Sequence, residues 1–108
     1  MASTIRGGMS DTVNKLNKLR NNTIIPEEQI RLQKIINVYF FLWQQVIYDQ
    51  LDSSTQEYKD AIKALKAAEK TVDDALAGIK SVAEVIESAA KAAQIIGRII
   101  GTVIDMAI

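Results

Sequence analysis

The chain has 108 residues, 48% of them hydrophobic, a length and composition typical of one folded domain. Thirteen basic residues balance thirteen acidic ones, so no net charge attracts nucleic acid, and a nucleic-acid partner is not expected. The absence of histidine and cysteine removes the commonest general base, the best thiol nucleophile and the thiolate metal ligands.

The N-terminal segment divides into a leader and a short helix. Residues 1–9 contain two adjacent glycines and no periodic apolar pattern, so a flexible leader is expected there. Ser10 is a capping-type residue, and Val13 and Leu16 follow at helical spacing, although several asparagines weaken the pattern. A short helix over residues 10–21 is predicted.

A second helix begins at Pro26, because proline suits the first helical position and the glutamates that follow complement the positive end of the helix dipole. Apolar residues then recur at intervals of three and four, as on a buried helical face: Leu32, Ile35, Ile36, Tyr39, Trp43, Val46, Ile47 and Leu51. Phe40 and Phe41 widen that face, and the aromatic group is expected in the core. A strand over residues 38–43 is the alternative from propensity, but the helical period continues on both sides and predicts a helix over 26–52.

The third helix is predicted to be long. Asp52, Ser53 and Ser54 interrupt the apolar pattern and indicate a turn, and Ser54 with Glu57 matches a capping box at a helix start. The helical period then continues to the C-terminus, which predicts one helix over residues 55–108. Gly78 is expected to bend this helix at most, since a lone glycine costs only about 1 kcal/mol in a helix interior. The alternative is a reversal at Gly78 that closes a three-helix bundle.

These elements predict an all-α fold, a helical hairpin with a long C-terminal helix and a short N-terminal helix, and a single helical domain over residues 10–108. An unbroken helix over 55–108 would span about 80 Å against about 40 Å for residues 26–52, so its C-terminal part would protrude. Val13 and Leu16 of the N-terminal helix are expected to pack against that protruding part.

The C-terminal segment carries the candidate interface. Its polar residues gather into a narrow stripe, and aliphatic residues cover about two-thirds of the circumference, more than one neighbouring helix can bury. Small residues repeat every four positions and include a GxxxG pattern, which permits close helix approach in an oligomer or in lipid; ordinary packing inside one bundle is the equal alternative. The predicted interface residues are Ala93, Ile96, Gly97, Ile99, Ile100, Gly101, Val103 and Ile104.

No catalytic, cofactor-binding or metal-binding residues are assigned. The closest acidic groupings, Asp49 with Asp52 and Asp73 with Asp74, lack the paired glutamate pattern of a carboxylate-bridged bundle site and are expected on a solvated face. An enzyme with a small-molecule substrate or a cofactor is therefore not expected.

The sequence instead predicts a non-enzymatic structural or interaction protein. Its apolar C-terminal helix would assemble as a coiled coil in a homo-oligomer or bind a helical protein partner. The alternative is a membrane-active helical protein, a pore-forming or lipid-surface component in which residues 82–108 meet the bilayer. The sequence assigns no localisation.

Overall fold

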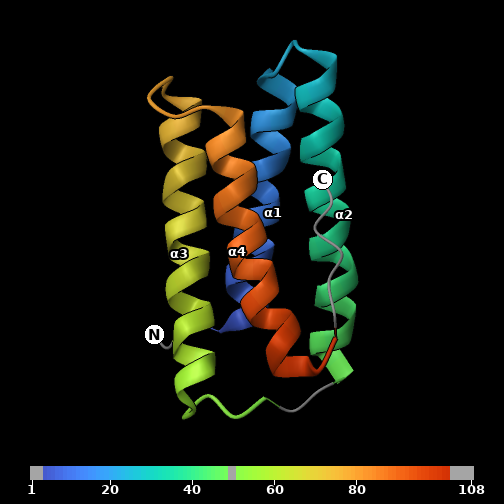
Figure 1. Ribbon diagram of the computed structural model, residues 1–108, viewed down its shortest axis with the longest axis vertical. Helices are drawn as coiled ribbons and strands as arrows, with labels where there is room; N and C mark the ends of the chain where they lie inside the picture. Colours follow the sequence, from blue (N-terminus) through green and yellow to red (C-terminus); the bar gives the residue numbers. More distant parts are fainter. Residues whose placement is uncertain (1–3, 49–50, 103–108) are drawn as a thin grey trace.

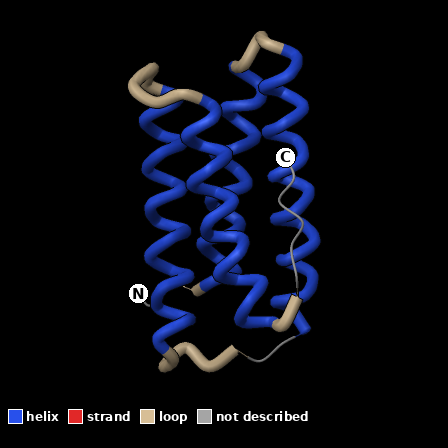
Figure 2. Tube along the Cα trace, in the orientation of Figure 1, coloured by secondary structure: helices blue, strands red, loops and turns tan. Residues whose placement is uncertain are grey.

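The computed structural model describes residues 4–48 and 51–102. Four α-helices make up most of these residues: α1 (Ile5–Asn22), α2 (Pro26–Tyr48), α3 (Gln56–Leu76) and α4 (Val82–Ile100) (Figure 1). Only helices, turns and loops occur in the described part of the chain (Figure 2). The predicted all-α fold is confirmed, and residues 38–43 are helical rather than a strand.

The helices pack as a ring in which each contacts two neighbours. Helix α1 contacts α2 and α3, and α4 contacts the same two helices. Two antiparallel hairpins, α1–α2 and α3–α4, thus lie side by side, with α1 parallel to α3 and α2 parallel to α4 (Figure 1). Both short turns, residues 23–25 and 77–81, lie at one end of the bundle, whereas α2 ends and α3 begins at the other.

The interior takes one apolar stripe from each helix, as helical spacing predicts. The largest fully buried side chains are Ile5, Met9 and Leu16 of α1; Leu32, Ile35, Ile36, Tyr39 and Leu42 of α2; Leu65 and Val72 of α3; and Val85 and Ile96 of α4. The Tyr39 hydroxyl donates to the carbonyl oxygen of Ala89 at 2.7 Å, so this polar group is satisfied within the core. Burial raises the pKa of Tyr39 far above its usual range.

The predicted single helix over residues 55–108 is corrected by a reversal of the chain after Leu76. Gly78 has φ +80°, a left-handed conformation that glycine adopts without a Cβ clash. The Ile79 N–H donates to the Asp74 carbonyl at 2.8 Å and the Gly78 N–H to the Ala75 carbonyl at 3.0 Å. These two bonds form the Schellman motif, which ends a helix rather than bending it.

A new helix starts three residues after Gly78. The Ser81 hydroxyl accepts from the Glu84 N–H, and the Glu84 carboxylate accepts from the Ser81 N–H, so both halves of a capping box are present. The alternative of a reversal at Gly78 is therefore the one that holds, with four helices in place of three. Residues 103–108 of the predicted long helix lie outside the described residues.

The predicted flexible leader is corrected for residues 5–9, since α1 begins at Ile5, and residues 1–3 lie outside the described residues. The Thr4 hydroxyl caps it by accepting from the Gly7 N–H, and the Ile5 N–H donates to the Tyr58 hydroxyl of α3 at 3.1 Å. A Cβ on Gly8 would lie 2.9 Å from the Leu65 Cδ1, so this glycine lets α1 approach α3 closely. Gly8 thus marks a contact between helices, and both glycines lie within α1.

The predicted packing of α1 is partly right. Val13 and Leu16 are buried, but α1 contacts α2 and α3 rather than the C-terminal helix, because the reversal after Leu76 leaves no protruding rod. Helix α1 also extends five residues before the predicted start at residue 10.

The predicted turn at Asp52 to Ser54 is confirmed, but its cap is not. Thr55, not Ser54, is the N-cap of α3, and its hydroxyl accepts from the Tyr58 N–H. Ser54 instead donates its N–H and its hydroxyl to the Asp52 carboxylate, at 2.9 and 2.6 Å. These bonds lower the pKa of Asp52.

Candidate interaction surface

The structure distributes the predicted interface residues of the C-terminal helix over several environments. Ala93, Ile96 and Gly97 are buried within the bundle. Ile99 and Ile100 are half-buried, and Gly101 is the exposed C-cap of α4 with φ +72°. Val103 and Ile104 lie outside the described residues.

The small residues of α4 pack inside this chain. Ala89, Ala92 and Ala93 are fully buried, and so are Ala61 and Ala68 of the neighbouring α3. Small side chains on facing helices permit close approach of the backbones, which is the alternative of ordinary packing inside one bundle. Contact of Ile99 and Ile100 with another molecule stays a prediction.

An exposed aromatic surface lies instead on α2. Phe40 is 51% exposed and Phe41 48%, and the half-buried Trp43 lies one turn beyond Phe40. The expectation that all these aromatic residues are in the core is wrong for Phe40 and Phe41. The reason is the position of each residue around the helix axis. At about 100° per residue, Phe41 points about 160° away from the buried Tyr39 and therefore faces away from the core.

A groove between α1 and α2 lies beside Phe40 and Trp43, whereas Phe41 lies about 100° farther around α2 than Phe40 and does not line the groove. Its volume is about 200 Å³, and it is lined by Met9, Ser10, Val13, Asn14, Asn17, Phe40 and Trp43. The guanidinium of Arg6 lies 5.7 Å from the centroid of the Trp43 ring, a cation–π contact at the rim. We call Phe40, Phe41, Trp43 and the five α1 residues of the groove the aromatic surface.

The aromatic surface is uncharged in its own residues. The sequence from Ile35 to Tyr48 contains no Asp, Glu, Lys or Arg, and the groove residues of α1 are apolar or neutral. A surface of neutral residues with exposed aromatic rings favours contact with apolar groups, because covering these residues desolvates no charge of their own and leaves the Arg6 guanidinium at the rim.

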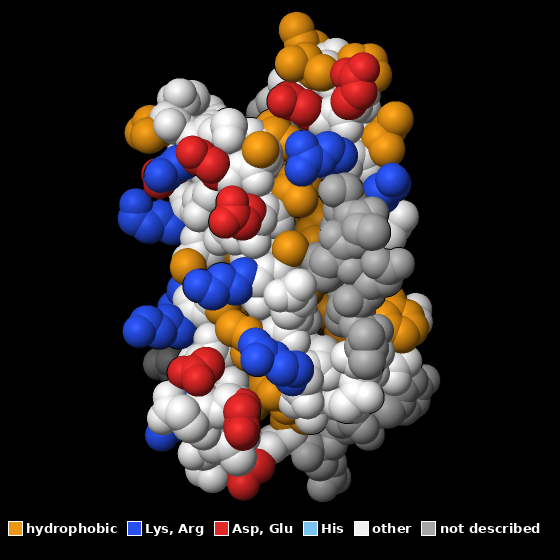
Figure 3. Space-filling view, viewed as in Figure 1, with side chains coloured by type: hydrophobic (Ala, Val, Ile, Leu, Met, Phe, Trp, Pro, Cys, Tyr) orange, Lys and Arg blue, Asp and Glu red, His pale blue; other side chains and the backbone are white. Residues whose placement is uncertain are grey.

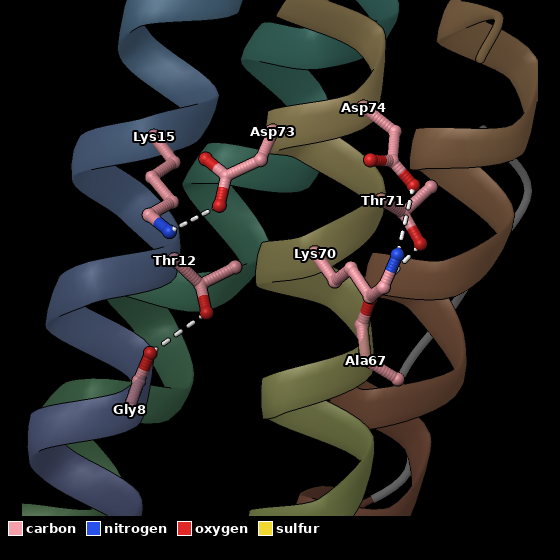
Figure 4. Close-up of polar contacts among 8 residues, drawn as sticks. All are labelled: Gly8, Thr12, Lys15, Ala67, Lys70, Thr71, Asp73 and Asp74. Atoms are coloured by element: carbon pink, nitrogen blue, oxygen red, sulfur yellow. Dashed lines mark hydrogen bonds and ion pairs between the residues drawn. The ribbon is translucent and has the colours of Figure 1, made fainter. Parts of the chain in front are cut away.

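Charged side chains are concentrated on the α3–α4 hairpin and at the contact between α3 and α1. The Lys15 ammonium lies 2.8 Å from the Asp73 carboxylate, and Lys70 lies 3.4 Å from Asp74 one turn along α3 (Figure 4). The hydrogen bond to Asp73 raises the pKa of Lys15. Asp73 and Asp74 thus face two separate lysines.

The described residues hold no group of three or more acidic side chains placed to bind a metal ion. A hollow of about 640 Å³ near the start of α3 is lined by Asp52, Glu57 and Asp60, with Arg98 among its other residues. Asp49, the other acidic candidate of the sequence, lies outside the described residues.

Comparison with protein families, with curated proteins and with solved structures finds no match to this chain. Within residues 4–48 and 51–102, none of the helices combines the length and apolar character needed to cross a bilayer.

Proposed function

We propose that this chain is a non-enzymatic interaction protein whose aromatic surface binds a helix, either of a second copy or of a helical partner. The observation that carries the proposal is the exposure of Phe40 and Phe41, about half each, on a charge-free stretch of α2. Fully burying one such side chain contributes about 1.5–3 kcal/mol, so covering the exposed halves of the two rings would supply about that amount in total.

The groove beside Phe40 supports a helical occupant. It lies between two antiparallel helices, so a third helix can place its side chains between theirs. Aromatic residues are enriched in the buried centres of protein interfaces, whereas charged residues are depleted there. Both features match the aromatic surface.

Self-assembly is the version of this proposal that the chain alone can test. Light scattering across a concentration series should show an increase in mass, and Trp43, the chain's single tryptophan, should report the covering of the groove through a change in its emission. Phe40→Ser with Phe41→Ser should shift assembly to at least about tenfold higher concentration.

Two further variants locate the contact. Lys34→Ser with Asn37→Ser changes exposed polar residues of the same helix and should leave assembly unchanged. Ile99→Ser tests the predicted interface on α4. If Ile99→Ser weakens assembly and the double phenylalanine variant does not, the contact belongs to the end of α4 and the proposed surface is wrong.

A further inference from the structure

Five aliphatic side chains at or beside the two turns define a second unusual surface, which we call the aliphatic end. Ile24 is 90% exposed, Ile79 72%, Ile30 57%, Ile25 47% and Leu76 37%. Both turns lie at the same end of the bundle, and hydrophobic side chains stand over both upper corners in Figure 3. Polar residues are usual in such turns, so this composition needs a physical reason.

Local helix-capping motifs do not supply that reason. Ile24 is placed as the apolar residue of a hydrophobic staple before α2, but its partner position is Gln29, whose side chain donates to the Thr23 carbonyl. Ile79 is placed as the apolar residue of the Schellman motif, but its partner position is Asp74, which pairs with Lys70. Both isoleucines therefore lack the contact that usually covers them.

The geometry of the aliphatic end favours a flat apolar occupant. The two most exposed side chains stand on separate turns, so one compact pocket does not cover both. The bundle measures 40 × 28 × 17 Å, and its two shorter dimensions bound this end, which is therefore its smallest face. A stable protein interface buries about 800 Å² on each partner, which is more than this small face favours. A lipid surface accepts separate side chains without requiring a continuous patch.

We propose that the aliphatic end contacts a lipid surface, with Ile24 and Ile79 entering the boundary between headgroups and acyl chains. Charges of both signs flank the turns, with Glu27 and Glu28 on one hairpin and Lys80 on the other. Net attraction to anionic lipid is therefore small, and apolar burial carries the binding. This contact is independent of the aromatic surface, which lies farther along α1 and α2.

Flotation of the full chain with uncharged phosphatidylcholine vesicles tests the proposal. The chain should float, and Ile24→Asn with Ile79→Asn should lower the partition coefficient at least about tenfold. The control, Lys34→Ser with Asn37→Ser, changes exposed residues on the side of the bundle and should float like the unaltered chain. Failure of the unaltered chain to float, or equal flotation of the isoleucine variant, overturns the proposal.

Site-specific labels then locate the contact. Because the chain has no cysteine, an environment-sensitive dye can be attached at Ile79→Cys or, at the other end of the bundle, at Ser53→Cys. Vesicles should shift the emission of the first label to the blue and leave the second unchanged.

Two other results separate the alternatives. A blue shift at both labels, or binding that requires anionic lipid, refutes contact through the aliphatic end. A loss of assembly by the isoleucine variant without vesicles means that the end binds a second copy. Loss of assembly in the phenylalanine variant bears only on the proposed function.

Discussion

Glu69 is a carboxyl whose surroundings disfavour its charge. Partial burial between α1 and α3 raises its pKa above the ordinary 4.5, and this effect outweighs the lowering by the nearby Lys15 ammonium, while Asp11 and Asp73 raise it further. An acid with a raised folded-state pKa binds its proton more tightly when folded. The favourable contribution of this proton to folding stability is fully present below the pKa of Glu69 in the unfolded chain, near 4.5. It is lost as the pH rises through the pKa of Glu69 in the folded chain.

Replacing Glu69 with glutamine should therefore stabilise the bundle at neutral pH. The neutral amide removes the cost of keeping a carboxylate in this half-buried place near Asp11 and Asp73. Thermal unfolding should show a higher Tm for Glu69→Gln at about pH 7 and little difference at about pH 3, where the carboxyl is protonated in both states.

The control for this prediction is Glu87→Gln on the exposed surface of α4, which should change Tm much less at either pH. A lower Tm for Glu69→Gln at neutral pH would mean that attraction to Lys15 outweighs burial, against the direction derived above.

Single residues also show why the candidate surface was only partly predictable. The apolar period places Leu32, Ile35 and Tyr39 in the core correctly. The sequence pattern predicts a widened buried face that includes Phe40 and Phe41, because they are large and adjacent to it. Their angular positions carried the missing signal, since a helix in a four-helix ring buries one arc and leaves the opposite side exposed.

At the scale of elements, the boundary between α3 and α4 was present in the sequence as two signals. Gly78 is followed three residues later by Ser81, and Ser81-Val82-Ala83-Glu84 is a capping box. The apolar period continues through this boundary, so the period alone predicts a single helix. The all-helical fold, α2 and the turn near Asp52 depend on strong local patterns and were predictable, whereas the ring depends on contacts distant in sequence.

These stop signals give an element-scale prediction for Gly78→Ala with Ser81→Ala. Alanine in the left-handed conformation costs about 1–2 kcal/mol, and loss of the serine cap costs about 1 kcal/mol. Chemical denaturation should show a lower free energy of unfolding by the order of 2–3 kcal/mol.

The same double variant should also increase the fraction of dimer. Both substitutions favour a continuous helix through residues 77–81, and a straightened α3–α4 can bury its apolar stripes only against a second copy. Lys80→Ala, in the same turn, keeps both signals and should match the unaltered chain in stability and mass. Equal stability of the double variant would show that neither motif determines the reversal.

For the whole molecule, the two hairpins depend on each other. Helix α1 contacts α2 within its own hairpin and α3 of the other hairpin. Helix α4 contacts α3 within its own hairpin and α2 of the other hairpin. Each hairpin alone exposes the stripe that the other covers. If the aliphatic end meets a lipid surface, the long axis of the bundle points away from that surface and the aromatic surface stays open to a protein partner.

Deleting residues 1–22 tests this interdependence. The deletion removes five buried apolar side chains of α1, Ile5, Met9, Val13, Leu16 and Leu19. At about 1.5–3 kcal/mol for each, the lost burial is on the order of 10 kcal/mol, comparable to the whole stability of a small domain. The shortened chain should lose its cooperative thermal transition, bind a hydrophobic dye strongly and aggregate.

The outcome separates an integral helix from an appended arm. A flexible leader with a weakly packed helix would leave residues 26–102 folded after the deletion, with a cooperative transition and little dye binding. Lys18→Ala in the full chain changes an exposed residue of the same helix and should keep the transition. Leu16→Ala lies between these cases: its fully buried side chain should cost about 2–5 kcal/mol, so the transition should move to lower temperature and remain cooperative.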